Sequence, residues 1–267
     1  GDVRAVLCTP LGLDHQEYLG DTLPRIASEK FAVLRPGRPA VFAGADPEVE
    51  SLFLERARRI GASPWIHRTS CRVELAHLDL EGVRFHRFSL GASPQRDLVF
   101  PLTGVHQPGN ASLALGALEH LGGLFPRLDP ATLRRGLAAT RWPGRMEWFP
   151  KGEGGVLLDG AHNPHGVEAL ARSLEALGVS GEGWGLVFAA MGDKEILPSL
   201  RRLAPFFETL WCTSVPESPR ALPAASLADR AREAGWPGLL EIQEDPLDAL
   251  DRALRRHPRV VACGSLF

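Results

Sequence analysis

The feature that most constrains the fold is a regular alternation of short apolar runs with amphipathic stretches along the second half of the chain. The apolar runs have the length of buried strands, and the stretches between them have helical periodicity. Strands that alternate with helices in this way form βαβ units, whose strands lie parallel in one sheet. We therefore predict four or five parallel strands, within residues 156–160, 185–191, 207–214, 240–242 and 259–265.

The first half begins with a similar pattern and then changes. Apolar runs at 3–8 and 39–44 alternate with helical stretches at 21–34 and 46–60. From residue 72 to residue 102 apolar and polar residues alternate one by one, which is typical of antiparallel strands with one face in water. Strands are expected at 72–80, 83–90 and 97–102, followed by helices over 107–121 and 129–139.

The length of 267 residues predicts two domains, because single hydrophobic cores stop growing at roughly 250 residues. The Pro-Gly pair within residues 140–145 is a natural interdomain hinge. We place the domains at 1–140 and 141–267.

Composition excludes several classes of protein. Hydrophobic residues make up 44% and charged residues 23%, as in soluble globular proteins. No apolar run reaches the roughly 20 residues of a membrane span, and the first residues lack a secretory pattern, so we expect a cytoplasmic protein. A formal net charge of -2 provides no basic field for a nucleic acid. The four widely spaced cysteines (Cys8, Cys71, Cys212 and Cys263) are expected to be buried free thiols.

Four clusters of polar residues could carry chemistry. Asp14 and His15 follow the first predicted strand, at the edge where open α/β sheets bind ligands, and Lys30 lies on the next helix. His106, Gln107 and Asn110 lie at the start of the helix predicted over 107–121, and three polar residues there are more than capping alone requires. Arg145 offers a planar guanidinium suited to phosphate oxygens. The fourth cluster is Asp159, His162 and Asn163, in the run LLDGAHNPHG.

Taken together, these segments resemble the folylpolyglutamate synthase/dihydrofolate synthase family of the Mur ligase superfamily. The segment TPLGLDHQEYLGDTLPRIASEKFAVLRPG matches the family pattern over about thirty residues, with Pro10 in place of Asn or Ser and Phe31 in place of Ala. LLDGAHNPHG is the most specific match. FAAMGDKEI and SVPESPRAL also resemble family segments, which makes Asp193, Lys194 and Arg220 candidate lining residues.

The resemblance implies an α/β fold, in which part of a Mur-ligase-type ATPase domain precedes a Rossmann-like C-terminal domain with a mostly parallel sheet. It assigns ATP contacts to Asn110, Arg145 and Asp159, with His106, Gln107 and Asn163 nearby. His162 would lie by the reacting phosphate and the incoming amino acid. His15 would be a Mg²⁺ ligand, and Lys30 would form a carbamate with CO₂ and help to hold the metal.

The implied reaction is the ATP-dependent addition of L-glutamate to a folate or to dihydropteroate through an acyl phosphate, by a monomer. None of the three lysines is followed within two residues by Ser or Thr, so the family's phosphate-binding loop is missing and we expect a fragment that is inactive alone. A Mur-type ligase for a peptidoglycan precursor and a nucleotide-binding module without catalysis remain alternatives. A Rossmann dehydrogenase is disfavoured, because no G-x-G-x-x-G follows a strand.

Overall fold

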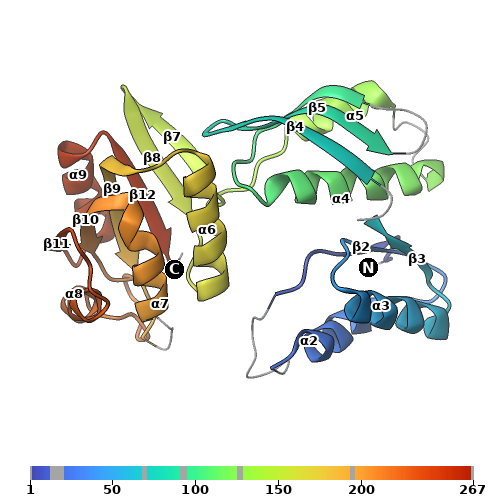
Figure 1. Ribbon diagram of the computed structural model, residues 1–267, viewed down its shortest axis with the longest axis horizontal. Helices are drawn as coiled ribbons and strands as arrows, with labels where there is room; N and C mark the ends of the chain where they lie inside the picture. Colours follow the sequence, from blue (N-terminus) through green and yellow to red (C-terminus); the bar gives the residue numbers. More distant parts are fainter. Residues whose placement is uncertain are drawn as a thin grey trace. The chain divides into compact units, whose positions relative to one another are not determined.

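The computed structural model describes residues 2–12, 21–67, 71–90, 95–124, 129–192 and 196–265. The chain divides into two compact units (Figure 1). The first comprises Gly1–His77, Val83–Phe100 and His106–Thr140. The second comprises Leu78–Gly82, Pro101–Val105 and Arg141–Phe267.

The first unit contains a small parallel sheet with helices on both faces. Its strands are β1 (Val6–Cys8), β2 (Pro39–Phe42) and β3 (Ser63–Ile66), in that order. Helices α2 (Leu23–Lys30) and α3 (Pro47–Ile60) pack on one face, and α4 (Gln107–His120) packs on the other. The predicted helix 21–34 ends earlier than expected, because the chain tightens after Lys30 into a 3₁₀ turn, Phe31–Val33.

Phe31 has a structural role in this unit. Its ring lies 5.2 Å from the rings of both Phe42 and Phe53, which are themselves 5.2 Å apart. All three side chains are fully buried between the sheet and its two helices. The residue that departs from the family pattern therefore fills the core, where ring pairs at this spacing are favourable.

The alternating segments form the predicted antiparallel sheet. Its strands are β4 (Cys71–Asp79), β5 (Gly82–Leu90) and β6 (Gln95–Phe100), in the order β4, β5, β6. Helix α5 (Pro130–Ala138) packs on β6, where the Arg134 guanidinium donates to the carbonyl oxygens of Arg96 and Asp97 at 2.8 and 3.0 Å. The helix predicted over 129–139 is confirmed, and Asp129 caps it by accepting a hydrogen bond from the backbone N–H of Thr132.

The second unit is built on one six-stranded sheet. Five strands are parallel, as predicted: β8 (Gly154–Asp159), β9 (Gly181–Ala189), β10 (Phe207–Cys212), β11 (Leu239–Ile242) and β12 (Arg259–Gly264). The order is β11, β10, β9, β12, β8, β7, and β7 (Glu147–Lys151) is antiparallel to β8. Helices α6 (Pro164–Ala176), α7 (Ile196–Leu203) and α8 (Ala224–Glu233) cover one face, and α9 (Pro246–Arg256) covers the other.

Two strands, β3 and β7, were not expected from the sequence. Both are edge strands of their sheets, and each contains a proline, Pro64 or Pro150. Proline cannot donate to a ladder of hydrogen bonds, so a strand that contains one is tolerated at an edge and gives a weak sequence signal.

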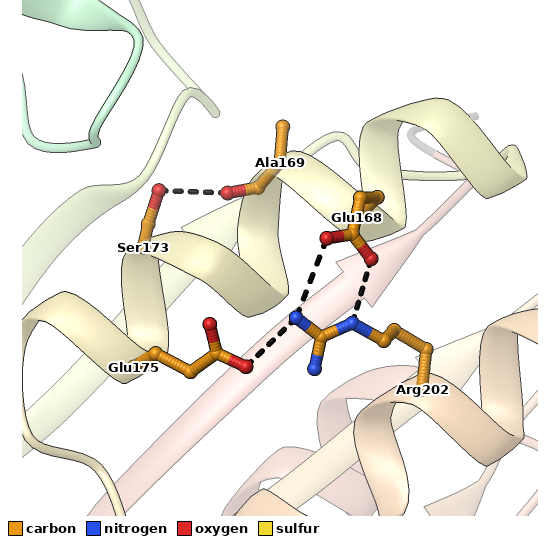
Figure 2. Close-up of polar contacts among 5 residues, drawn as sticks. All are labelled: Glu168, Ala169, Ser173, Glu175 and Arg202. Carbon is orange, nitrogen blue, oxygen red and sulfur yellow. Dashed lines mark hydrogen bonds and ion pairs between the residues drawn. The ribbon is translucent and has the colours of Figure 1, made fainter.

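An ion-pair network links α6 to α7. Figure 2 shows the guanidinium of Arg202 between the carboxylates of Glu168 and Glu175. The shortest contacts are 2.6 Å to Glu168 and 2.8 Å to Glu175. On the same helix α6, Ser173 donates to the carbonyl oxygen of Ala169, one turn earlier (Figure 2).

Three of the four cysteines are buried free thiols, as predicted: Cys8, Cys212 and Cys263. Burial raises the pKa of Cys8 to about 11 and that of Cys212 to about 12, so both remain protonated and unreactive at neutral pH. The side chain of Cys71 lies outside the described residues. Within the described part of the chain, no helix is long and apolar enough to cross a membrane.

Candidate functional site

Asp159 is the buried centre of the candidate site in the second unit. It is the last residue of β8 and is 8% exposed. One carboxylate oxygen accepts the backbone N–H of Met146, and the other accepts the backbone N–H of Ala161, both at 2.9 Å. The carboxylate therefore joins the turn before β7 to the loop after β8.

Burial raises the pKa of Asp159, because desolvation disfavours the charged form. The hydrogen bonds from Met146 and Ala161 oppose this shift, as do the charges of Arg145 and His162. Arg145 directly precedes Met146 and His162 directly follows Ala161, so both residues flank the backbone groups that the carboxylate binds. Residues predicted from two separate motifs thus meet at the carboxyl end of the parallel sheet.

The loop after β8 presents His162 and Asn163. His162 is exposed, and its Nδ1 lies 2.8 Å from the carbonyl oxygen of Gly160. This contact fixes the ring beside the loop backbone, which leaves Nε2 as the nitrogen available for chemistry. Asn163 is the N-cap of α6, and its side-chain oxygen accepts the backbone N–H of Gly166 at 2.7 Å. Its observed contact is thus a helix cap, which begins α6 directly after the loop.

Arg145 lies in the turn that Asp159 holds. Its side chain is exposed, whereas Met146 beside it is 2% exposed. Met146 has a φ of 47°, in the left-handed region that is uncommon for residues other than glycine. This conformation could not be predicted from the sequence, because a methionine normally adopts extended or helical backbone angles. The unusual turn directs the Met146 N–H to Asp159 and leaves the Arg145 side chain in solvent.

A cavity of about 300 Å³ opens beside this turn within the second unit. Arg145 and Met146 contribute to its wall, and two indole rings add flat apolar surface. It is also lined by Glu81 and Thr103, whose segments belong to this unit, and by Trp142 and Trp148. Two carboxylates and two guanidiniums, from Glu81, Glu147, Arg141 and Arg145, share the lining with the indoles, so the cavity combines charged groups with flat apolar surface.

The residues predicted at the start of α4 belong to the first unit. The side-chain amide of Asn110 donates to the side-chain oxygen of Gln107 at 3.1 Å, and the Asn110 backbone N–H donates to the carbonyl oxygen of His106. Gln107 is 4% exposed, Asn110 is half-buried and His106 is exposed. The buried Gln107 therefore orients the more accessible Asn110 amide.

Lys30 lies on a different helix, α2, from the predicted residues at the start of α4. Lys30 is exposed at the last turn of α2, which packs on the opposite face of the small sheet from α4. Its charge lowers the pKa of Cys8 and so opposes the larger effect of burial. Cys8 is the last residue of β1, from which the predicted ligand His15 follows in sequence.

Several predicted residues lie outside the described part of the chain. These are Asp14, His15, Asp193, Lys194 and the neighbouring Glu195. Arg220 is described, and its side chain is exposed while its carbonyl oxygen accepts the Gly192 N–H at 2.9 Å. That backbone contact ties the Arg220 segment to the end of β9.

Comparison with known proteins gives a consistent result. Residues 144–266 match the family model described as "Mur ligase, glutamate ligase domain". The chain is 33% identical over 253 residues to the dihydrofolate synthase/folylpolyglutamate synthase of Mycobacterium tuberculosis, a match that covers 92% of this chain and 51% of that protein. The chain therefore spans about half the length of this curated relative.

Solved structures show the same relation. The folylpolyglutamate synthase of Mycobacterium tuberculosis, complexed with ADP and AMPPCP, superposes with a TM-score of 0.82 at 30% identity, and the match covers 98% of this chain and 61% of that one. The FolC protein of E. coli, complexed with DHPP and ADP, gives a TM-score of 0.80 at 26% identity, covering 99% of this chain and 59% of that one.

Proposed function

Because the chain belongs to the folylpolyglutamate synthase/dihydrofolate synthase family, we propose that the whole protein is an ATP-dependent ligase that adds L-glutamate to a folate or to dihydropteroate. The observation that carries this proposal is the Asp159 cluster. Its buried carboxylate accepts the backbone N–H of Met146, next to Arg145, and that of Ala161, next to His162, at the ligand-binding edge of a parallel sheet.

The reaction that fits this site has two steps. A substrate carboxylate oxygen attacks the γ-phosphorus of ATP, which forms an acyl phosphate and releases ADP. The amine of L-glutamate then attacks the acyl carbon, which forms the amide and releases phosphate and a proton. An acyl phosphate reacts readily with water, so a site that performs both steps must exclude water between them.

The described residues can each contribute to these steps. The exposed Arg145 guanidinium supplies two parallel donors for phosphate oxygens. His162 lies near Asp159 with Nε2 available, so it can accept or donate a proton near the reacting phosphate. Asn163 begins α6, whose positive end favours an anion nearby. Asp159 itself acts by holding these groups in place.

The first unit would recognise the rest of the nucleotide. Asn110 presents a half-buried amide that Gln107 orients, and an amide in a fixed orientation can read the edge of a base. His106 directly precedes Gln107 in the chain and is exposed at the same end of α4. The complexes of the relatives with ADP support a nucleotide as the ligand.

The metal and the modified lysine rest on the resemblance. Mg²⁺ would neutralise the phosphate charge, with His15 and a carbamate on Lys30 as ligands. A carbamate forms when a neutral lysine amine adds to CO₂ and loses a proton. Lys30 is exposed among the described residues, so its amine is accessible to CO₂.

The names of the relatives favour a folate over a peptidoglycan precursor. The complex of the E. coli protein with DHPP supports a pteroate-like substrate for this family member too. We further propose that residues 1–140 belong to the ATP-binding domain and 141–267 to the glutamate ligase domain, in a monomeric cytoplasmic enzyme that needs neither a membrane nor a nucleic acid.

The decisive experiment is a mass measurement of the product that the complete gene product forms from ATP, L-glutamate and each folate. We expect a product heavier by one glutamate residue, and phosphate release only when folate and glutamate are both present. Turnover of a UDP-muramyl substrate without turnover of any folate would establish the Mur-type alternative. Nucleotide binding without any product would establish a binding module.

A further inference from the structure

A buried histidine joins α4 to the small parallel sheet. His67 directly follows β3 and is 7% exposed. Its Nε2 lies 2.6 Å from the hydroxyl oxygen of Ser112 on α4, which is 4% exposed. The two residues are 45 positions apart, so this contact belongs to the tertiary structure.

The imidazole is neutral and its proton can be assigned. Burial lowers the pKa of His67, which disfavours the charged ring. Its Nδ1 is buried without a hydrogen-bond partner in the described part of the chain. A buried N–H without an acceptor is rarer than a buried acceptor without a donor. The proton therefore lies on Nε2, and His67 donates it to Ser112.

The helix lies directly against the ring. Gly116 is one turn beyond Ser112 on the same face of α4. A Cβ atom at Gly116 would lie 2.9 Å from His67 Nδ1 and 2.7 Å from the indole of Trp65, which is closer than side chains approach. The Trp65 ring packs edge-on against His67 at 5.4 Å between centroids. His67 is thus confined between Trp65 and the surface of the helix.

The hydrogen bond has an effect that the neighbouring apolar contacts cannot have. Leu113 and Ala117 of α4 pack on Val41 of β2, but apolar contacts are not directional and tolerate sliding. The donor and acceptor of a hydrogen bond must meet within a narrow range of distance and angle. The contact between His67 and Ser112 therefore fixes the position of α4 along its axis.

That position matters because Asn110 lies two residues before Ser112 on the same helix. A helix that slips by one residue moves about 1.5 Å and turns about 100°, which would carry the Asn110 amide away from its ligand. We propose that His67 is a positioning residue for nucleotide binding, which acts through Ser112 on the first turn of α4. This inference rests on the proposed role of Asn110 as a nucleotide contact.

The test uses three variants of the complete gene product. His67→Phe keeps a ring of similar size and removes the donor, Ser112→Ala removes the acceptor, and His67→Gln restores a donor near the Nε2 position. We expect the first two to raise the KM for ATP by about tenfold, with kcat and the KM for the folate unchanged within about twofold. His67→Gln is expected to restore the wild-type KM for ATP.

A fourth variant separates this inference from the proposed function. Asn110→Ala should itself raise the KM for ATP, and adding His67→Phe to it should raise the KM no further, because His67 acts through Asn110. If Asn110→Ala leaves the KM unchanged, the assignment of Asn110 is wrong. If Asn110→Ala raises it and His67→Phe multiplies the effect independently, the positioning role is wrong.

Thermal unfolding of each variant shows whether it is folded. A purely structural role would lower the melting temperature and reduce the amount of active enzyme, and so lower kcat without a selective change in the KM for ATP. That result, or a failure of His67→Gln to restore the KM, overturns the inference.

Discussion

Replacing Asp159 by alanine tests the buried carboxylate that organises the candidate site. The variant leaves the backbone N–H groups of Met146 and Ala161 without their acceptor in a buried position. Each unsatisfied donor costs about 1–3 kcal/mol, but the variant also removes the cost of burying a carboxylate, and water can enter the space. We expect Asp159→Ala to lower the free energy of unfolding by about 2 kcal/mol, which corresponds to a fall of roughly 4–8 °C in Tm.

Asp245→Ala is the matched control. Asp245 also accepts two backbone N–H groups, from Leu247 and Asp248 at 2.8 and 2.9 Å, but its side chain is exposed. Water can replace it, so the expected loss is about 1 kcal/mol. Urea unfolding followed by tryptophan fluorescence reports mainly on the second unit, because Trp65 is the one tryptophan in the first.

The pH dependence of stability tests whether burial raises the pKa of Asp159. Burial raises the pKa of folded Asp159 above its ordinary value of 3.8, so the folded state binds more protons than the unfolded state at a pH just above that value. Stability from this group is therefore complete below 3.8 and is lost as pH rises through the folded pKa. The destabilisation by Asp159→Ala should be larger near about pH 4 than near about pH 8.

Two outcomes would refute this reasoning about Asp159. If Asp159→Ala lowers the free energy of unfolding by no more than Asp245→Ala does, burial does not increase the contribution of the hydrogen bonds from Met146 and Ala161. A destabilisation that grows with rising pH would mean that the hydrogen bonds and the charge of Arg145 outweigh burial in setting the pKa.

Two further predictions concern the second unit. Arg202→Ala should lower the free energy of unfolding by about 1–2 kcal/mol, because it breaks contacts to two carboxylates and to the Phe206 ring. The control Arg201→Ala, at an exposed position, should change it by less than about 0.5 kcal/mol. Equal losses in the two variants would show that the network in Figure 2 contributes nothing to stability. Gly264→Ala should prevent soluble expression, because Gly264 has a φ of 116° and an added Cβ would overlap the carbonyl oxygen of Ala189. The control Gly178→Ala has a φ of 71° but open space around the added Cβ, so it should lower the free energy of unfolding in urea by about 1 kcal/mol. A soluble Gly264→Ala variant of wild-type stability would contradict the packing of β12 on β9.

The sequence predicted most elements of the fold because their periodicity is strong. The five parallel strands of the second unit were all expected, as were the helices that begin after Asp46 and Asp129. Strands β3 and β7 were missed because each contains a proline and lies at a sheet edge. Edge strands need fewer ladder hydrogen bonds, so their sequences are less constrained and less recognisable.

The sequence also predicted that site residues close together along the chain lie in one loop. Asp159, His162 and Asn163 share one strand-to-helix loop, and a loop at the carboxyl end of a parallel strand has a known place in the fold. Arg145 is 14 residues earlier, but β7 returns antiparallel to β8 and brings its turn back to Asp159. The sequence could propose each residue, but it could not show that this hydrogen bond joins them.

The sequence by itself determined the α/β class, the order of the main elements and the residue types available for chemistry, because these depend on periodicity and on short motifs. The tertiary structure alone decided that the Met146 N–H meets Asp159 and that His67 meets Ser112. Such contacts form between distant segments whose spacing is set by the packing of whole sheets and helices. No local pattern encodes that distance, so it emerges only when the core is assembled.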